Sequence, residues 1–128
     1  MRRWLPIGAA SIVAFDTVAS FAAEGIDFDY GSLWPLSILL VLTFAFLAGR
    51  ETGSVRAGLL TGAGVALTES TIGWAISWAV GPGALDQEDR TAVSVAATIL
   101  FVVTAGCVVG VVGGWLGTRF GRPIATEQ

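Results

Sequence analysis

The chain has 128 residues, of which 54% are hydrophobic and only 13% are charged, and its formal net charge is −3 at pH 7. Soluble domains carry about 25% charged residues, so this composition excludes an ordinary soluble fold and predicts an integral membrane protein. With no histidine, one cysteine and no basic patch, we expect no metal ion, no cofactor and no nucleic-acid partner.

The first predicted element is a transmembrane helix over residues 4–23. It follows two arginines and ends near small residues, a pattern that is also typical of a cleaved secretory signal. Asp16 interrupts the apolar run, which argues against a signal. We therefore interpret the segment as a retained helix.

Three further apolar runs lie near residues 33–49, 57–80 and 93–116. Their lengths are close to the roughly 20 residues that cross a bilayer core of about 30 Å. Pro35 fits the first turn of the second helix, where a missing N–H costs nothing. Residues 119–128 form a tail too short for a domain. The sequence thus predicts an all-α membrane protein in which the whole chain is one domain, a four-transmembrane-helix bundle.

The distribution of arginine predicts the orientation of these helices. With an even number of spans, both termini and the middle connection lie on one side of the membrane. Most of the basic residues fall on that side: Arg2, Arg3, Arg50, Arg56, Arg119 and Arg122. The other side has one arginine and several acids: Arg90, Glu24, Asp27, Asp29, Asp86, Glu88 and Asp89. Because cytoplasmic loops carry the excess of positive charge, we expect both termini in the cytoplasm of a multi-pass plasma-membrane protein.

Four tryptophans lie near the ends of predicted spans: Trp4, Trp34, Trp78 and Trp115. Their amphipathic rings favour the headgroup level of a bilayer, so we interpret these residues as membrane-interface anchors. Trp74 lies deeper in the third span. The lipid bilayer is thus the first partner that the sequence predicts.

Small residues recur every four positions in the third and fourth spans. The third span carries Gly58 and Gly62, and the fourth carries Gly106, Gly110 and Gly114. Such faces let helix backbones approach closely in lipid, where no hydrophobic force drives helices together. Two interpretations stay open: helix packing within one bundle, and an oligomer interface with further copies or with a larger membrane complex.

Glu69 stands near the middle of the third apolar run, GLLTGAGVALTESTIGWAISWAV. An acid at the centre of a transmembrane helix costs about 2.5 to 3.5 kcal/mol to insert, so such residues are usually paired, protonated or beside water. Helical spacing predicts that Glu69 shares one face with Gly58, Gly62, Ala66 and Gly73, and that this face points into protein.

Asp16 is the other deep acid, and no arginine lies at the depth of either carboxyl. Three hydroxyl groups are expected to donate hydrogen bonds to Glu69, those of Thr68, Ser70 and Thr71. If the two carboxyls face each other, they cannot both ionise cheaply and would share a proton. Two interpretations stay open: protonated acids that link helices by hydrogen bonds, and an intramembrane site for a proton or a cation.

The sequence contains no serine or cysteine with a histidine partner, no phosphate-binding glycine loop before a lysine and no paired aspartates of a metal site. We therefore expect no enzymatic activity. The first expected function is that of a non-catalytic structural or accessory subunit, which assembles through its glycine-rich helix faces. The alternative is a small homo-oligomeric transporter or channel for protons or cations that uses Glu69 and Asp16.

Overall fold

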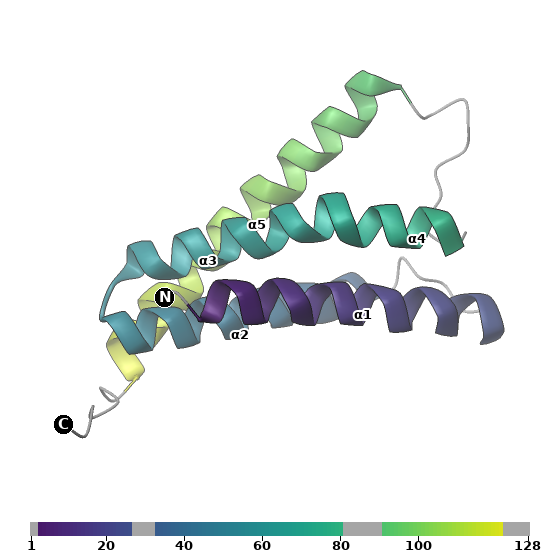
Figure 1. The fold of residues 1–128 in the computed structure, drawn as a ribbon. Helices are drawn as coiled ribbons and strands as arrows, with labels where there is room; N and C mark the ends of the chain where they lie inside the picture. Colours follow the sequence, from purple (N-terminus) through teal and green to yellow (C-terminus); the bar gives the residue numbers. More distant parts are fainter. Residues whose placement is uncertain (1–2, 27–32, 81–90, 122–128) are drawn as a thin grey trace.

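The computed structural model describes residues 3–26, 33–80 and 91–121, and its regular secondary structure is helical throughout (Figure 1). In chain order the elements are α1 (Trp4–Ile26), α2 (Trp34–Thr52), α3 (Val55–Thr68), the π-helix η2 (Glu69–Gly73), α4 (Trp74–Val80) and α5 (Ala92–Phe120). The acidic stretches expected at 27–29 and 86–89 lie outside the described residues. Of the tail expected over residues 119–128, Arg119 and Phe120 belong instead to the last turn of α5, and 122–128 lie outside the described residues.

Three described helices are long and apolar enough to cross a membrane, by length and composition: Trp4–Ala23 within α1, Trp34–Thr52 and Ala92–Phe120. They correspond to the first, second and fourth runs expected from the sequence. The all-helical fold is thereby confirmed, and the membrane location predicted from composition is supported. Each helix extends a few residues beyond the expected end of its apolar run.

α2 shows how local sequence sets the ends of a helix. Pro35 occupies its first turn, where the missing N–H leaves no hydrogen bond unmade. The helix is ended by Gly53, whose φ of 64° is left-handed and whose N–H donates to the Gly49 carbonyl at 2.8 Å. Only Gly53 and Ser54 then separate α2 from α3, so these two helices are forced to lie antiparallel and adjacent.

The third apolar run differs from the single α-helix that the sequence predicts for residues 57–80. It begins at Val55 and changes to π-helical hydrogen bonding at Glu69, where the N–H of Trp74 donates to the Glu69 carbonyl five residues earlier. The α-helical pattern then resumes as α4. Because the bonding changes in the middle, the α-helical parts are only 14 and 7 residues long, each shorter than a membrane span.

The buried face of α1 repeats every three or four residues and includes Gly8, Ile12, Asp16, Ala19, Ser20 and Ala23. Ile12 packs with Val41 of α2 and Val65 of α3 in the central apolar cluster. Asp16 is one turn along the same face and is only 1% exposed. The carboxyl of Asp16 therefore faces the protein interior and not lipid.

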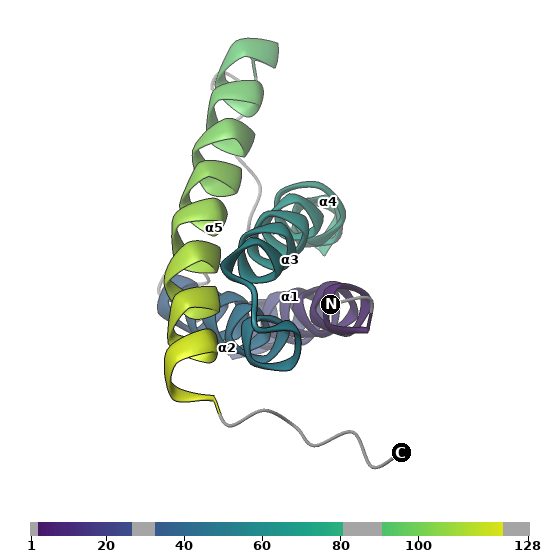
Figure 2. The ribbon, with the colours of Figure 1, turned by 90° about the vertical axis from the view of Figure 1, so that its left-hand side faces the viewer.

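Two stripes of glycine on α5 contact two different helices. Gly106 and Gly110 lie against α3, and a β-carbon added at Gly110 would stand 2.7 Å from the Gly58 carbonyl oxygen. Gly113 lies against α2, and a β-carbon added there would stand 2.8 Å from the Leu42 carbonyl oxygen. Only glycine permits backbones to come this close. α5 therefore packs across α2 and α3 at backbone distance (Figure 2).

The two halves of α5 have different surroundings. Its buried residues all lie in the C-terminal half, between Gly106 and Gly117. The N-terminal half diverges from the other helices (Figure 1), and Val93 and Phe101 are 78% and 73% exposed. Apolar side chains without protein cover suit contact with lipid chains, which are as apolar as leucine. The divergence leaves a space between the first half of α5 and α2.

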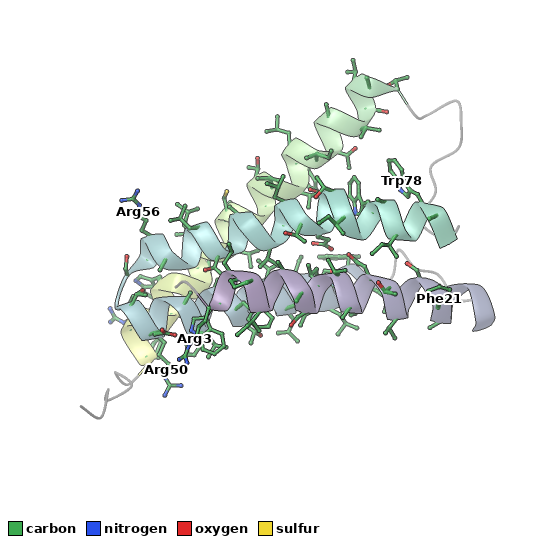
Figure 3. All side chains as sticks on the ribbon, in the orientation of Figure 1. Arg3, Phe21, Arg50, Arg56 and Trp78 are labelled. Carbon is green, nitrogen blue, oxygen red and sulfur yellow. The ribbon has the colours of Figure 1, made fainter. Side chains whose placement is uncertain are left out.

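Arg3, Arg50 and Arg56 lie at one end of the molecule, which we name the arginine end (Figure 3). α5, which carries Arg119 in its last turn, ends on the same side (Figure 1). Arg3 donates to the Glu51 carboxylate at 2.9 Å, and the indole N–H of Trp4 donates to the same carboxylate. These contacts join the start of α1 to the end of α2. We name the opposite end, which holds Phe21 and Trp78, the far end (Figure 3).

Replacement of Gly110 by alanine is expected to lower the free energy of unfolding by about 1–3 kcal/mol, because the added methyl group would press on backbone atoms of α3. Unfolding in mixed micelles, titrated with a denaturing detergent, measures this change. Gly25→Ala is the matched control, since a β-carbon at Gly25 has no neighbour within 4 Å and alanine is the better helix former. Equal stability of the two variants would contradict the backbone contact.

Candidate functional site

Glu69 is the first residue of η2 and is half-buried, and its side chain lines two adjoining cavities. The first cavity, which we name the α2–α5 hollow, has a volume of about 160 Å³; its walls include Trp34, Ser37, Ile38, Glu69, Phe101 and Val102. The second, which we name the tryptophan hollow, has a volume of about 190 Å³; its walls are Phe15, Leu33, Trp34, Ser37, Glu69, Trp74 and Val102. Glu69 therefore stands on a wall that both hollows share.

Ser37 of α2 is hydrogen-bonded through its side chain to the Glu69 carboxyl. A serine hydroxyl has one proton to donate, and a carboxylate accepts it. Ser37 is also buried and lines both hollows. Ser37 is not among the site residues expected from the sequence. The available signal was a small polar residue within the otherwise apolar start of α2, close after Pro35.

The three hydroxyl groups that we expected to donate to Glu69 donate to backbone carbonyls instead. Thr68 donates to the carbonyl of Gly64 at 2.9 Å, and both Ser70 and Thr71 donate to that of Leu67, at 3.2 and 2.6 Å. Hydroxyl groups on a helix readily bond back to the preceding turn. The expectation was therefore wrong, and the described partner of Glu69 comes from a different helix.

The predicted common face of the third run ends at Glu69. Gly58 and Gly62 contact α5, and Ala66 and Glu69 both line the α2–α5 hollow, whereas Gly73 contacts Asp16 of α1. A π-turn inserts one extra residue, which turns the side chains that follow it by about 100°, the rotation of one residue in an α-helix. The expectation of a single face was therefore wrong for Gly73, because the count assumed a regular α-helix.

Asp16 and Gly73 form a close contact between α1 and the end of η2. A β-carbon added at Gly73 would overlap a carboxyl oxygen of Asp16, so the carboxyl group occupies the space that any larger residue at position 73 would need. Asp16 therefore packs against η2, while Glu69 bonds to α2. The lining residues of the two hollows do not include Asp16.

Two buried hydroxyl groups in the described part of the chain have no hydrogen-bond partner there: those of Ser20 on α1 and Thr61 on α3. Ser20 is one turn beyond Asp16 on the buried face of α1. Buried polar groups without partners are uncommon in proteins. Neither residue is among the site residues expected from the sequence, and neither lines the two hollows.

The five glycines selected from the sequence lie between α3 and α5 within one chain: Gly58, Gly62, Gly106, Gly110 and Gly114. All of them are buried. Packing within one bundle therefore accounts for these faces, and an interface with another subunit would have to use a different surface.

The tryptophans selected as membrane anchors have different local contacts. Trp4 bonds to Glu51 at the arginine end, and Trp34 is 64% exposed at the start of α2. Trp78 stacks on Trp74 with 6.2 Å between the ring centroids. The guanidinium of Arg119 lies 5.6 Å from the ring centroid of Trp115. Their role as interface anchors stays a prediction.

No protein-family model, curated protein or solved structure matches this chain. Within residues 3–26, 33–80 and 91–121, no group of three or more histidine, cysteine, aspartate or glutamate residues is placed to hold a metal ion. The interpretation of the site therefore depends on its own geometry. That geometry consists of one acid in a π-turn, one serine partner and two hollows with apolar walls.

A double-mutant cycle tests the contact between Asp16 and Gly73. Gly73→Ala alone is expected to destabilise the protein, because the new methyl group overlaps the Asp16 carboxyl. With Asp16→Ala also present, the same methyl group is 3.5 Å from the remaining β-carbon, which is an ordinary contact. We expect a coupling of about 1 kcal/mol or more in the free energy of unfolding.

The matched control for this cycle pairs Asp16→Ala with Gly25→Ala. These positions are about 13 Å apart along α1, so their effects should add. Additive effects for Asp16 and Gly73 as well would show that the two residues do not touch.

Proposed function

We propose that the protein is a small transporter or channel that moves protons or cations across a membrane through the carboxyl group of Glu69. One observation carries this proposal. Glu69 stands at the first residue of a π-turn, bonds to a neighbouring helix through Ser37, and forms part of the wall of two hollows. Ionisable residues within membrane helices commonly mark ion pathways and proton relays.

The π-turn supports this proposal independently of the acid. π-helical turns are rare, their hydrogen bonding is less favourable than that of the α-helix, and they often coincide with functional sites. In this chain the π-turn begins at Glu69, whose carboxyl bonds to Ser37 of α2. A local cost in backbone bonding at an intramembrane acid is typical of a position kept for its chemistry.

Asp16 has a supporting role in this proposal. Its side chain is buried on the inner face of α1 and lies against Gly73, the last residue of η2. It therefore holds α1 against the π-turn that presents Glu69. The proton or cation itself binds at Glu69, where the hollows provide space.

The proposal includes a topology. The continuous segment α3–η2–α4 forms one crossing, which brings the number of crossings to four. The arginine end lies in the cytoplasm, with both termini, because positive charge is retained on that side. The membrane is the plasma membrane, and the far end of the molecule faces outward.

Glu69→Gln tests the proposal, because glutamine keeps the shape of the side chain but cannot release a proton or carry a negative charge. Purified protein in liposomes should carry a proton flux driven by an imposed membrane potential, and we expect the variant to fall to the flux of protein-free liposomes. An internal pH-sensitive dye measures this flux.

Glu51→Gln is the control, since Glu51 lies at the arginine end and outside both hollows. It should keep the flux of the wild-type protein. If Glu69→Gln folds and also keeps that flux, transport through Glu69 is ruled out.

The exposed first half of α5 favours a second candidate function, that of a non-catalytic accessory subunit in a larger membrane complex. Val93, Leu100 and Phe101 are 78%, 68% and 73% exposed, so this surface is free to receive a partner helix. The glycine faces do not serve this purpose, since they are covered within the chain.

Gentle extraction from the native membrane, followed by sizing and mass identification, distinguishes the two candidates. Stoichiometric co-migration with other proteins is expected for an accessory subunit. A homo-oligomer or a single chain without other proteins is expected for the transporter.

A further inference from the structure

The two hollows beside Glu69 combine one acid with apolar walls that include four aromatic rings. Trp34 is on the wall of both hollows, Phe101 on that of the α2–α5 hollow, and Phe15 and Trp74 on that of the tryptophan hollow. Among the lining residues, only Glu69 and Ser37 have oxygen in their side chains. The walls therefore present one carboxyl group among apolar side chains, four of which carry aromatic rings.

These walls fit a bare inorganic cation poorly. Calcium takes six to eight oxygen ligands, and magnesium requires a nearly octahedral shell. The carboxyl of Glu69 and the hydroxyl of Ser37 offer three side-chain oxygens between them. An inorganic cation at Glu69 would have to keep most of its water in an apolar space.

The same walls fit an organic cation. The faces of tryptophan and phenylalanine rings attract ammonium groups, and quaternary ammonium ligands are characteristically bound by aromatic side chains. The attraction between a carboxylate and a cation is also stronger in apolar surroundings than in water. A ligand with a charged ammonium group and an apolar substituent can contact both the Glu69 carboxyl group and the aromatic rings.

The position of the rings suggests how such a ligand lies. Trp34 of α2 and Phe101 of α5 are 64% and 73% exposed, and they stand on opposite helices where α5 diverges. Glu69 lies on the third wall of the same hollow, provided by α3 and η2. The hollows are smaller than the roughly 300–1,000 Å³ of a typical ligand pocket, which favours a compact cation.

We propose that these hollows bind a compact organic cation, an alkyl- or arylammonium ion, with its charge at Glu69 and its apolar part between Trp34 and Phe101. This inference rests on the proposed function and names the class of its substrate. It assigns the aromatic residues a role in selecting the ligand, with the acid supplying the charge that the ligand must match.

Binding to the full chain in lipid nanodiscs, measured by isothermal titration calorimetry, tests the proposal with four probes. Benzyltrimethylammonium has both the charge and the ring, and it should bind in a saturable manner. Tetramethylammonium lacks the ring and should bind about tenfold more weakly, as the loss of ring contacts implies. Benzoate has a ring but the opposite charge, and it should not bind. Sodium ions should neither bind nor displace benzyltrimethylammonium.

Variants locate the site. Glu69→Gln should weaken binding of benzyltrimethylammonium at least about tenfold, the effect of losing one desolvated charge pair. Trp34→Leu should weaken it about fivefold, whereas Trp34→Phe keeps a ring and should change it little. Trp115→Leu is the matched control, because Trp115 lies near the arginine end of α5 and should leave binding unchanged.

Three results would overturn the inference: no binding of benzyltrimethylammonium to the wild-type chain, equal binding of benzoate, or unchanged binding in both Glu69→Gln and Trp34→Leu. If Glu69→Gln does not fold, the comparison of the four probes and the comparison of Trp34→Leu with Trp34→Phe still decide the question.

The proton-flux experiment separates this inference from the proposed function. A flux that depends on Glu69, together with no ammonium binding, would overturn the substrate class alone. If the protein binds ammonium ions but its proton flux does not depend on Glu69, proton transport through Glu69 would be overturned. The ammonium-binding site would still stand.

Discussion

The close backbone contact of α5 with α2 and α3 is the interaction on which the rest of the structure depends. Lipid provides no hydrophobic force between helices, so dispersion contacts between closely placed backbones must hold the bundle together. Glycines on α3 and α5 make this approach possible. The glycines of α5 all lie in its C-terminal half. The N-terminal half is consequently left to diverge, and the divergence creates the space in which Glu69 is found.

The π-turn η2 changes which helix the third run contacts. Glu69, at its start, bonds to Ser37 of α2, and Gly73, at its end, lies against Asp16 of α1. A regular α-helix would have kept Glu69 and Gly73 on one face. The irregularity therefore separates the two acids by task, since one lies beside the hollows and the other is enclosed between helices.

This division explains why an apolar bundle tolerates two deep acids. Asp16 is part of the buried face of α1, where it fills a space left by glycine. Glu69 is only half-buried and adjoins space large enough for a small ligand. The proposed organic cation would place its charge at this carboxyl and its apolar part against aromatic rings of the same walls.

The sequence by itself determined the class of fold, because long apolar runs with few charges suit only membrane-spanning helices. It also determined which residues carry the polar chemistry, since Asp16 and Glu69 are the only acids within those runs. Tertiary structure decided the partner of Glu69 and the course of the third run. Helical counting identifies neighbours along one helix, but Ser37 reaches Glu69 only because α2 packs beside η2. The choice between α and π hydrogen bonding likewise depends on contacts across helices, which no local pattern in residues 57–80 contains.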